Sequence, residues 1–402
     1  MAAPGRPRGV HRGPARRRPR RRCPARPGRG RRAGRLGRAA ARHRRADPRR
    51  ARRRLRQGGG RRARPRRGST PRLSVWAPTA RKVELALYSG SSGAGRTVHE
   101  MRRDDATGVW SVRGQPGWKG RYYTFLVTVY APAAGKIVTN EVTDPYSLSL
   151  AADSVRSQLV DLSDRSLQPG GWSSLAKPEP VAQQKASIYE LHVRDFSASD
   201  ASVPADQRGT YAAFGGDGNG MKELRKLAQD GLTHVHLLPV FDMATVPERR
   251  ADRAEPDCDL ASMPADSELQ QACVTGSAAK DSFNWGYDPS HYTVPEGSYA
   301  SEPDGSARIK EFRSMVGGLN GAGLRVVMDV VYNHTHAAGQ DPTAVLDRIV
   351  PGYYHRLLDD GAVATSTCCA NTAPEHAMMG SSSSTPSSPG PASTRWTASG
   401  ST

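Results

Sequence analysis

The sequence predicts an α/β fold in which a β-sandwich precedes the first part of a (β/α)8 TIM barrel, incomplete, with disordered segments at both ends. Two observations predict it. Short, roughly alternating apolar runs broken by Gly, Pro and Asp fill residues 71–165, which is typical of an all-β sandwich. Apolar strands separated by helical segments fill residues 180–380, which is typical of βα units around a parallel sheet.

Residues 1–70 precede the predicted sandwich and are dominated by Arg, Pro, Gly and Ala. They hold 29 Arg and one acidic residue, so the net charge of +21 comes entirely from this segment. With almost nothing apolar to bury, the segment is predicted to be disordered. Its composition resembles that of GC-rich DNA translated in the wrong reading frame. It would bind phosphate non-specifically, but it lacks aromatic side chains for stacking on bases, so we expect no specific nucleic-acid partner.

The sandwich is expected to contain strands at 73–78, 82–88, 108–112 and 122–130, which are rich in β-branched and aromatic residues. Its tryptophans, Trp76, Trp110 and Trp118, are candidates for stacking on a ligand. The sequence therefore allows a small binding module in front of the barrel.

The barrel part is expected to contain strands at 187–193, 233–239 and 324–331, with helices at 220–229 and 308–320. Each strand ends in polar residues, at 192–195, 239–242 and 329–334. Chemistry in a parallel α/β barrel is carried by the C-terminal ends of the strands, so these residues mark the expected site. Three strands are visible where a closed barrel needs eight.

Two motifs carry the candidate site residues. Residues 283–289 place Trp285, Tyr287 and Asp288 on a tight turn, where aromatic rings can stack on a sugar face and the acid can hold a hydroxyl; an aromatic plug in a turn is the structural alternative. Residues 326–334 form a buried strand that leaves Asp329 at its end, followed by Asn333 and His334. There a carboxylate can orient a neighbour and an imidazole can donate to a substrate hydroxyl.

Taken together, five segments resemble the pullulanase branch of the α-amylase family of glycoside hydrolases. The segments are 188–196, 233–239, 283–289, 326–335 and 351–379, and the similarity covers roughly residues 71–380. The sandwich is similar to the starch-binding-type module that precedes the barrel in these enzymes. Isoamylases and branching enzymes share parts of the motifs, and residues 351–379 favour the pullulanase branch.

The resemblance implies hydrolysis of α-1,6 branch linkages in pullulan, amylopectin or glycogen dextrins, with retention of configuration. Asp329 would be the supporting active-site Asp, His334 a contact to the sugar in the cleaved subsite, and Tyr287 the aromatic ring stacked under that sugar. Asn333 matches a position that supports a calcium ion in some relatives. The expected partner is a branched α-glucan, and no cofactor other than calcium is expected.

The catalytic pair itself finds no match in the chain. A retaining glycosidase needs two carboxylates about 5–5.5 Å apart, and no position here matches either one. Residues 381–402 read as a low-complexity, disordered tail. Back-translated and shifted by one nucleotide, however, this tail can spell KLIIDSVVTWASKYKVDGFRFD, a helix followed by a strand like the family's nucleophile region. The hypothesis is therefore a frameshifted tail and an inactive chain, and the alternative is a non-catalytic α-glucan-binding fragment.

The remaining expectations concern cysteines and location. A Cys258–Cys273 bridge is left open, and Cys368 with Cys369 is interpreted as two small buried residues. The sequence holds neither a signal-peptide core nor an apolar run that could span a membrane. As written, it is therefore expected to be cytoplasmic, with no membrane partner.

Overall fold

The computed structural model describes residues 70–366, 368–384 and 397–398. All of them fall within one compact unit, Arg45–Thr402. The disorder predicted for residues 1–69 and for most of 381–402 lies outside the described residues. Within them, no helix has the length and apolar character needed to cross a membrane.

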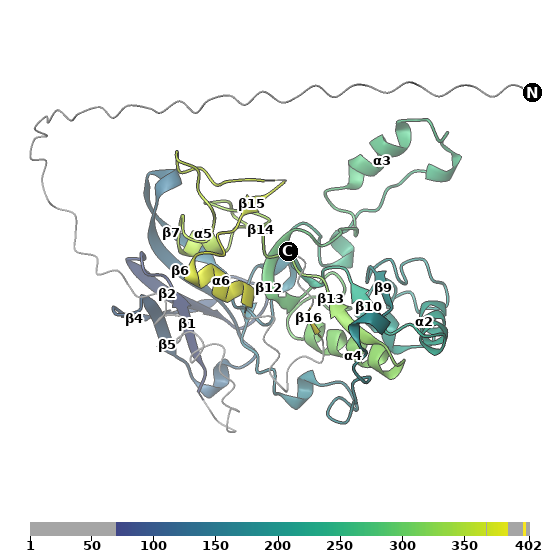
Figure 1. The fold of residues 1–402 in the computed structure, drawn as a ribbon. Helices are drawn as coiled ribbons and strands as arrows, with labels where there is room; N and C mark the ends of the chain where they lie inside the picture. The colour runs from purple at the N-terminus through teal and green to yellow at the C-terminus, as the bar shows by residue number, and fades with distance from the viewer. Residues whose placement is uncertain (1–69, 367, 385–396, 399–402) are drawn as a thin grey trace, which may run out of the picture. The chain divides into compact units, whose positions relative to one another are not determined.

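The N-terminal part forms two antiparallel sheets (Figure 1). One sheet has the order β1 (Arg72–Trp76), β5 (Val109–Arg113), β4 (Arg102–Asp104), and the other has the order β3 (Arg96–Glu100), β2 (Lys82–Tyr88), β6 (Tyr122–Ala131), β7 (Lys136–Val142), with β8 (Ser157–Gln158) paired to β6. The four strands predicted here are confirmed. β3, β4, β7 and β8 were not predicted, because they are short or largely exposed and lack a clear alternation of apolar residues.

The core of the sandwich extends into the C-terminal part of the chain. Trp76 is buried, and its ring meets the ring of Tyr353 edge-on at 4.7 Å. The amide of Asn140 donates to the carbonyl oxygen of Arg348 at 2.9 Å. Residues 345–379, which were predicted to belong to the barrel part, therefore supply side chains to the sandwich core. They include α5 (Leu346–Ile349) and the start of α6 (Ala377–Ser384).

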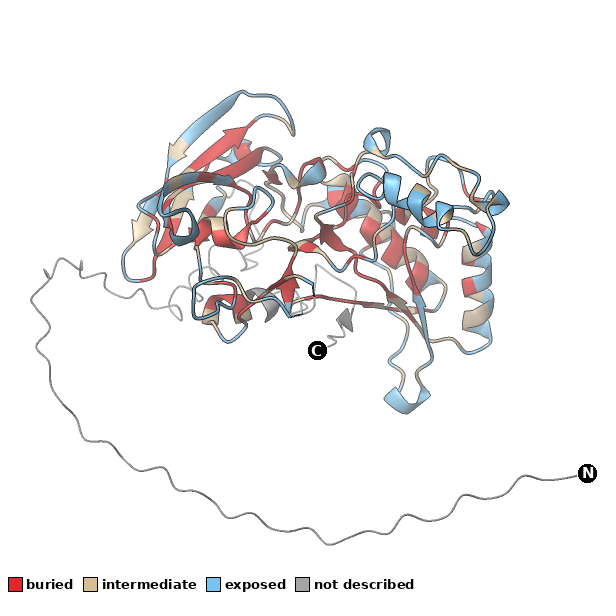
Figure 2. Cartoon of the chain, turned by 90° about the horizontal axis from the view of Figure 1, so that it is seen from above, coloured by how far each residue is buried: buried red, intermediate tan, exposed pale blue. Residues whose placement is uncertain are grey.

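The next part of the chain is built on a parallel sheet, as the alternation of strands and helices predicted. The sheet has the order β16 (Thr397–Ala398), β13 (Arg325–Met328), β10 (His234–Leu237), β9 (Ile188–Leu191), and its two helices are α2 (Asn219–Gln229) and α4 (Ala307–Gly321). Alternate residues of the strands, among them Leu237 and Val326, pack with Leu224 of α2 and Met315 of α4 in one core. Figure 2 shows the buried residues gathered in the sheets and on the inner sides of the helices.

The opposite face of the parallel sheet is not covered by a helix of the described chain. His236 lies in register between Glu190 on β9 and Val327 on β13, and none of the three is buried. The tail contributes the outermost strand, because Thr397 pairs with Val327. The disorder predicted for 381–402 therefore does not hold for this pairing, nor for the last residues of α6, which ends at Ser384.

The long connection expected after β10 contains elements that the sequence analysis missed. They are β11 (Phe241–Met243), β12 (Pro289–Pro295) and α3 (Leu269–Ser277). The first two pair antiparallel, while α3 projects away from the sheet (Figure 1). Further along the chain, β14 (His334–Thr335) pairs antiparallel with β15 (Ala370–Asn371). β12 and β14 bring the two predicted motifs to the same end of the parallel sheet.

Candidate functional site

Asp329 and Tyr287 meet at the C-terminal edge of the parallel sheet. Asp329 directly follows β13, and its backbone NH donates to the carbonyl oxygen of Leu237 at 2.9 Å, which continues the ladder past the strand end. The Tyr287 hydroxyl donates to Oδ2 of Asp329 at 2.8 Å. Burial, and next the hydrogen bond to Asp329, raise the pKa of Tyr287 to about 12. The tyrosine is therefore a stable proton donor to the carboxylate at neutral pH.

A tight turn holds Tyr287 in this position. The side-chain oxygen of Asn284 accepts from the backbone NH of Gly286 at 2.7 Å, and the ring of His192 donates to the carbonyl oxygen of Asn284 at 2.7 Å. Gly286 has a φ of +88°, and a Cβ there would lie 2.8 Å from the Cβ of Pro239. Only glycine suits both the left-handed backbone and this close approach.

The two aromatic rings predicted to bind sugar are accessible. Trp285 is 59% exposed and Tyr287 is 42% exposed. Trp285 packs edge-on against Phe283 with the ring centres 5.9 Å apart, which leaves much of the indole open to solvent. This turn thus presents aromatic surface beside the Asp329 carboxylate, the combination that sugar stacking needs.

Asp288, predicted to hold substrate, is engaged within the protein. Its Oδ2 accepts from the hydroxyl of Thr245 and, at 3.3 Å, from the amide of Asn284. Its Oδ1 is buried with no partner among the described residues. Burial raises the pKa of the carboxyl. In this state Asp288 fixes the base of the turn.

His334 lies beside the same turn. It is buried, and its Nε2 donates to the carbonyl oxygen of Tyr287 at 2.6 Å. Its Nδ1 is also buried, and the described residues offer it no hydrogen-bond partner. The structure therefore brings Asp329, Tyr287 and His334 together as the sequence predicted.

Asn333 is exposed, and its backbone carbonyl oxygen accepts from the NH of Thr372 at 3.0 Å. His334, the next residue along the chain, belongs to one of the two groups of three His, Cys, Asp or Glu side chains found in the described part of the chain. Calcium at Asn333 stays a prediction.

Glu190 and His236 lie on two of the predicted strands but were not predicted to be site residues. Glu190 stands on the uncovered sheet face near Tyr287, where its charge helps to raise the pKa of the phenol. Nδ1 of His236 lies 3.9 Å from Oε2 of Glu190, and its Nε2 is buried with no partner among the described residues. The signal that could have found them is their spacing, because Glu190 and His236 are paired in register on the same face of adjacent parallel strands.

A buried acidic cluster, defined by Asp242, Glu248 and Glu296, offers ligand atoms for a cation elsewhere in the fold. The fully buried guanidinium of Arg308 already provides the positive charge, donating to the two carboxylate oxygens of Glu248 at 3.1 and 2.7 Å. Burial raises the pKa of Glu248 to about 7 and raises that of Glu296 well above its usual range. Arg308 therefore forms a buried ion-pair network with this cluster.

Two expectations are corrected by the structure. Trp76, Trp110 and Trp118 are buried, at 3%, 8% and 6% exposure, so none can stack on a ligand. Their rings fill the sandwich core, where the indole NH groups of Trp76 and Trp110 donate to backbone carbonyl oxygens. Cys368 and Cys369 are joined by a disulfide and neither is buried, since Cys368 is exposed and Cys369 is half-buried.

Cys258 and Cys273 also form a disulfide, the pairing that the sequence analysis left open. It closes the projecting segment that carries α3.

The chain is similar to known proteins in sequence and in structure. Residues 60–147 match the family described as carbohydrate-binding module 48 (isoamylase N-terminal domain). A pullulanase from Klebsiella pneumoniae is 45% identical over an alignment that covers 76% of this chain and 32% of that protein, and pullulanase 1, chloroplastic, from Arabidopsis thaliana gives the same values. A crystal structure of Klebsiella pneumoniae pullulanase complexed with maltotriose is 42% identical and superposes with a TM-score of 0.74, covering 78% of this chain and 34% of that one. The chain is therefore a pullulanase homologue that spans about a third of the length of these relatives.

Proposed function

We propose that the chain is the substrate-binding part of a retaining, pullulanase-type glycoside hydrolase acting on α-1,6 branch linkages of pullulan, amylopectin or glycogen dextrins. Its parallel sheet would be the first part of a (β/α)8 barrel. The observation that carries the proposal is the hydrogen bond of an exposed tyrosine, Tyr287, to the carboxylate of Asp329 at the C-terminal edge of that sheet. Barrel enzymes place their chemistry at this edge.

Each member of the site has a task in binding a glucosyl unit. The open face of Tyr287 provides an apolar platform for the sugar ring. Asp329 fixes the orientation of the Tyr287 ring by accepting a hydrogen bond from the phenol hydroxyl. His334 fixes the main chain of Tyr287 from the other side, so the platform is rigid before any sugar arrives. A preformed platform lowers the entropy lost on binding.

Cleavage would need two further groups. A retaining mechanism requires a nucleophile and an acid/base about 5–5.5 Å apart. Asp329 is committed to Tyr287, and Glu190 faces His236 on the sheet, so neither is assigned as nucleophile. We therefore propose that residues 1–402 bind branched α-glucan without hydrolysing it.

A second candidate is glucan binding by the sandwich alone, which the match to carbohydrate-binding module 48 favours. Since its tryptophans are buried, a platform on the sandwich would have to use an exposed aromatic ring such as Tyr130 on β6, which is 53% exposed.

The two candidates are separated by affinity electrophoresis of the full chain in gels containing amylopectin. Tyr287→Ala is expected to weaken retardation by at least about fivefold, since truncating an aromatic residue that anchors a ligand costs about 1 kcal/mol or more. Tyr130→Ala is the matched control and is expected to bind like the unaltered chain. The reverse pattern would place binding on the sandwich, and release of reducing sugar from pullulan by the unaltered chain would overturn the proposed lack of hydrolysis.

A further inference from the structure

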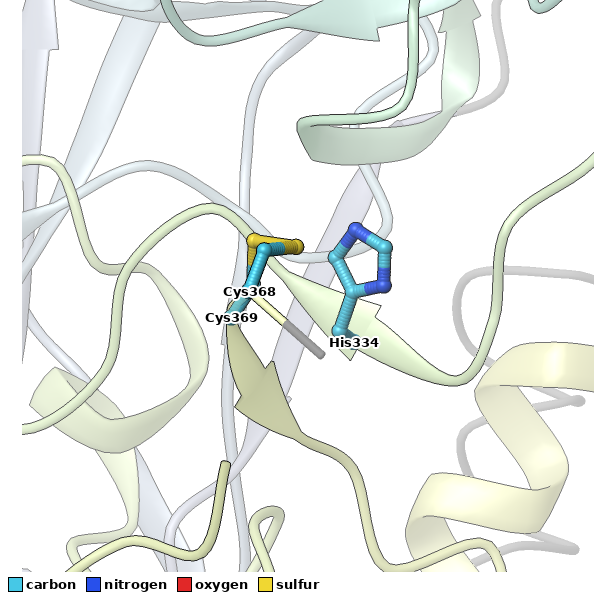
Figure 3. A group of neighbouring side chains, drawn as sticks. All are labelled: His334, Cys368 and Cys369. Atoms are coloured by element: carbon cyan, nitrogen blue, oxygen red, sulfur yellow. A yellow bond between two sulfur atoms is a disulfide. The ribbon is translucent and has the colours of Figure 1, made fainter. Parts of the chain in front are cut away.

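We propose that Cys368 and Cys369, once reduced, form with His334 a binding site for a thiophilic divalent cation of the zinc type. Both sulfur atoms and a ring nitrogen of His334 lie within 4.8 Å of one another. Figure 3 shows the cysteine pair and the imidazole as neighbours, with the two sulfur atoms bonded to each other. Two thiolates and one imidazole are a donor set that zinc prefers over calcium or magnesium.

The backbone holds these three residues in place whether or not the sulfur atoms are bonded. Cys369 directly precedes β15, and β15 pairs with β14 so that His334 lies opposite Asn371. The next residue along, Thr372, donates its NH to the carbonyl oxygen of Asn333 at 3.0 Å. Reduction of the disulfide therefore leaves the cysteines beside the histidine.

The imidazole of His334 is prepared to act as a ligand. Because its Nε2 donates a hydrogen to the carbonyl oxygen of Tyr287, the lone pair of the neutral ring lies on Nδ1. No described residue accepts or donates at that nitrogen, although it is buried. A buried, unpaired acceptor costs free energy unless something binds it. Coordination to a cation would satisfy this group.

The distances suit a tetrahedral cation. Zinc binds sulfur at about 2.3 Å and nitrogen at about 2.1 Å, which sets the ligand atoms roughly 3.5–4 Å apart. A ring nitrogen of His334 already lies within 4.8 Å of both sulfur atoms, and reduction frees the two sulfur atoms to separate to this spacing. Cys368 is exposed, so a cation can reach the pair from solvent and keep a water molecule as its fourth ligand.

The oxidation state decides whether the site exists. In the disulfide, both sulfur atoms are bonded to each other and neither is a thiolate. A dithiol reductant transfers two electrons and two protons to the pair, giving two thiols and leaving the reductant as its own disulfide. The cation then displaces the two thiol protons and binds two thiolates.

The test uses the full chain carrying Cys23→Ser, Cys258→Ser and Cys273→Ser, so that only the adjacent pair remains. The chain is reduced with dithiothreitol, freed of reductant without oxygen and titrated with Cd²⁺, a spectroscopic substitute for zinc. We expect the ultraviolet band of thiolate-to-cadmium charge transfer to saturate at one equivalent. The same chain left oxidised is the matched control and should give no band.

Two further variants test the ligands. Cys369→Ser should abolish saturation at one equivalent, and His334→Gln should weaken Cd²⁺ binding by at least about tenfold, the lower end of what loss of an outer-shell partner costs. Cadmium nuclear magnetic resonance should report a nitrogen ligand in the parent chain and none in His334→Gln. Absence of the band from the reduced chain, or equal Cd²⁺ affinity with and without His334, overturns the proposal.

Discussion

Replacing Arg308 with Met will test whether the buried acidic cluster is held together by this cation. Arg308 is 0% exposed and donates to both carboxylate oxygens of Glu248, while its Nη1 lies 3.6 Å from Oδ1 of Asp242. Removing one partner of a buried ion pair leaves an uncompensated charge and costs about 3–5 kcal/mol. We expect the free energy of unfolding to fall by about this amount at pH 8.

The cost of Arg308→Met will depend on pH. Burial raises the pKa of Glu248 to about 7 from an ordinary 4.5, a difference worth about 3 kcal/mol. A carboxyl whose pKa is raised on folding stabilises the fold below its unfolded pKa, and that contribution is lost as the pH rises through the folded pKa. Without Arg308 the pKa of Glu248 will rise further, so the variant will lose stability more steeply than the unaltered chain between about pH 5 and pH 8.

Urea unfolding followed by far-ultraviolet circular dichroism at pH 5 and pH 8 measures both effects. Arg249→Met is the matched control: its side chain is 40% exposed and pairs with Asp304, so we expect a loss of about 0–1 kcal/mol. A loss below about 1 kcal/mol for Arg308→Met, equal at the two pH values, would refute the assigned role of the cluster.

Four other predictions concern the Gly286 turn, the sandwich core, the edge strand β9 and the codons of the tail. Gly286→Ala will cost about 1–3 kcal/mol in urea unfolding and weaken binding to amylopectin, because of its left-handed φ and its contact with a proline; unchanged binding would argue against a rigid turn. Trp76→Ala will cost about 3–5 kcal/mol but leave the amylopectin affinity of the folded protein unchanged, in contrast to an exposed platform. Ile188→Lys, on the open edge strand β9 where the side chain is 60% exposed, will make residues 71–380 more soluble; a sharp monomeric melt of the unaltered full chain would contradict the reasoning. Resequencing the codons for Met379 to Thr402 will reveal one inserted or deleted base if the tail is frameshifted, and an intact frame with unrelated codons would end that hypothesis.

The sequence predicted the elements whose pattern is local. The strands ending at Leu237 and Met328 alternate buried apolar residues with half-buried ones, and they form the parallel sheet as expected. The edge strand β7 was missed because only one of its seven residues, Val142, is a buried apolar side chain. β11 was missed because three residues, including the charged Asp242, give no periodicity from which to predict a strand.

The candidate site was predicted from local motifs, whereas the buried acidic cluster was not predicted. Tyr287 and His334 stood out because each lies in a dense motif, and the hydrogen bond that joins His334 to the main chain of Tyr287 confirms that the motifs meet. The acidic cluster could not be predicted, because Arg308 lies 60 residues from Glu248 in the sequence and both are ordinary surface residue types. Only tertiary packing reveals that their burial is complete.

The burial of the tryptophans was misjudged for a related physical reason. An indole ring is suited both to stacking on a sugar and to filling a core, and composition alone cannot distinguish the two. What separates them is the partner of the indole NH: in Trp110 it donates to the carbonyl oxygen of Ala77, inside the sandwich. Trp285 makes its ring contact with Phe283 on a turn and keeps 59% of its surface exposed. Exposed aromatic surface is therefore concentrated where Asp329 and the two sheet residues, Glu190 and His236, provide polar groups, which is the arrangement a sugar site requires.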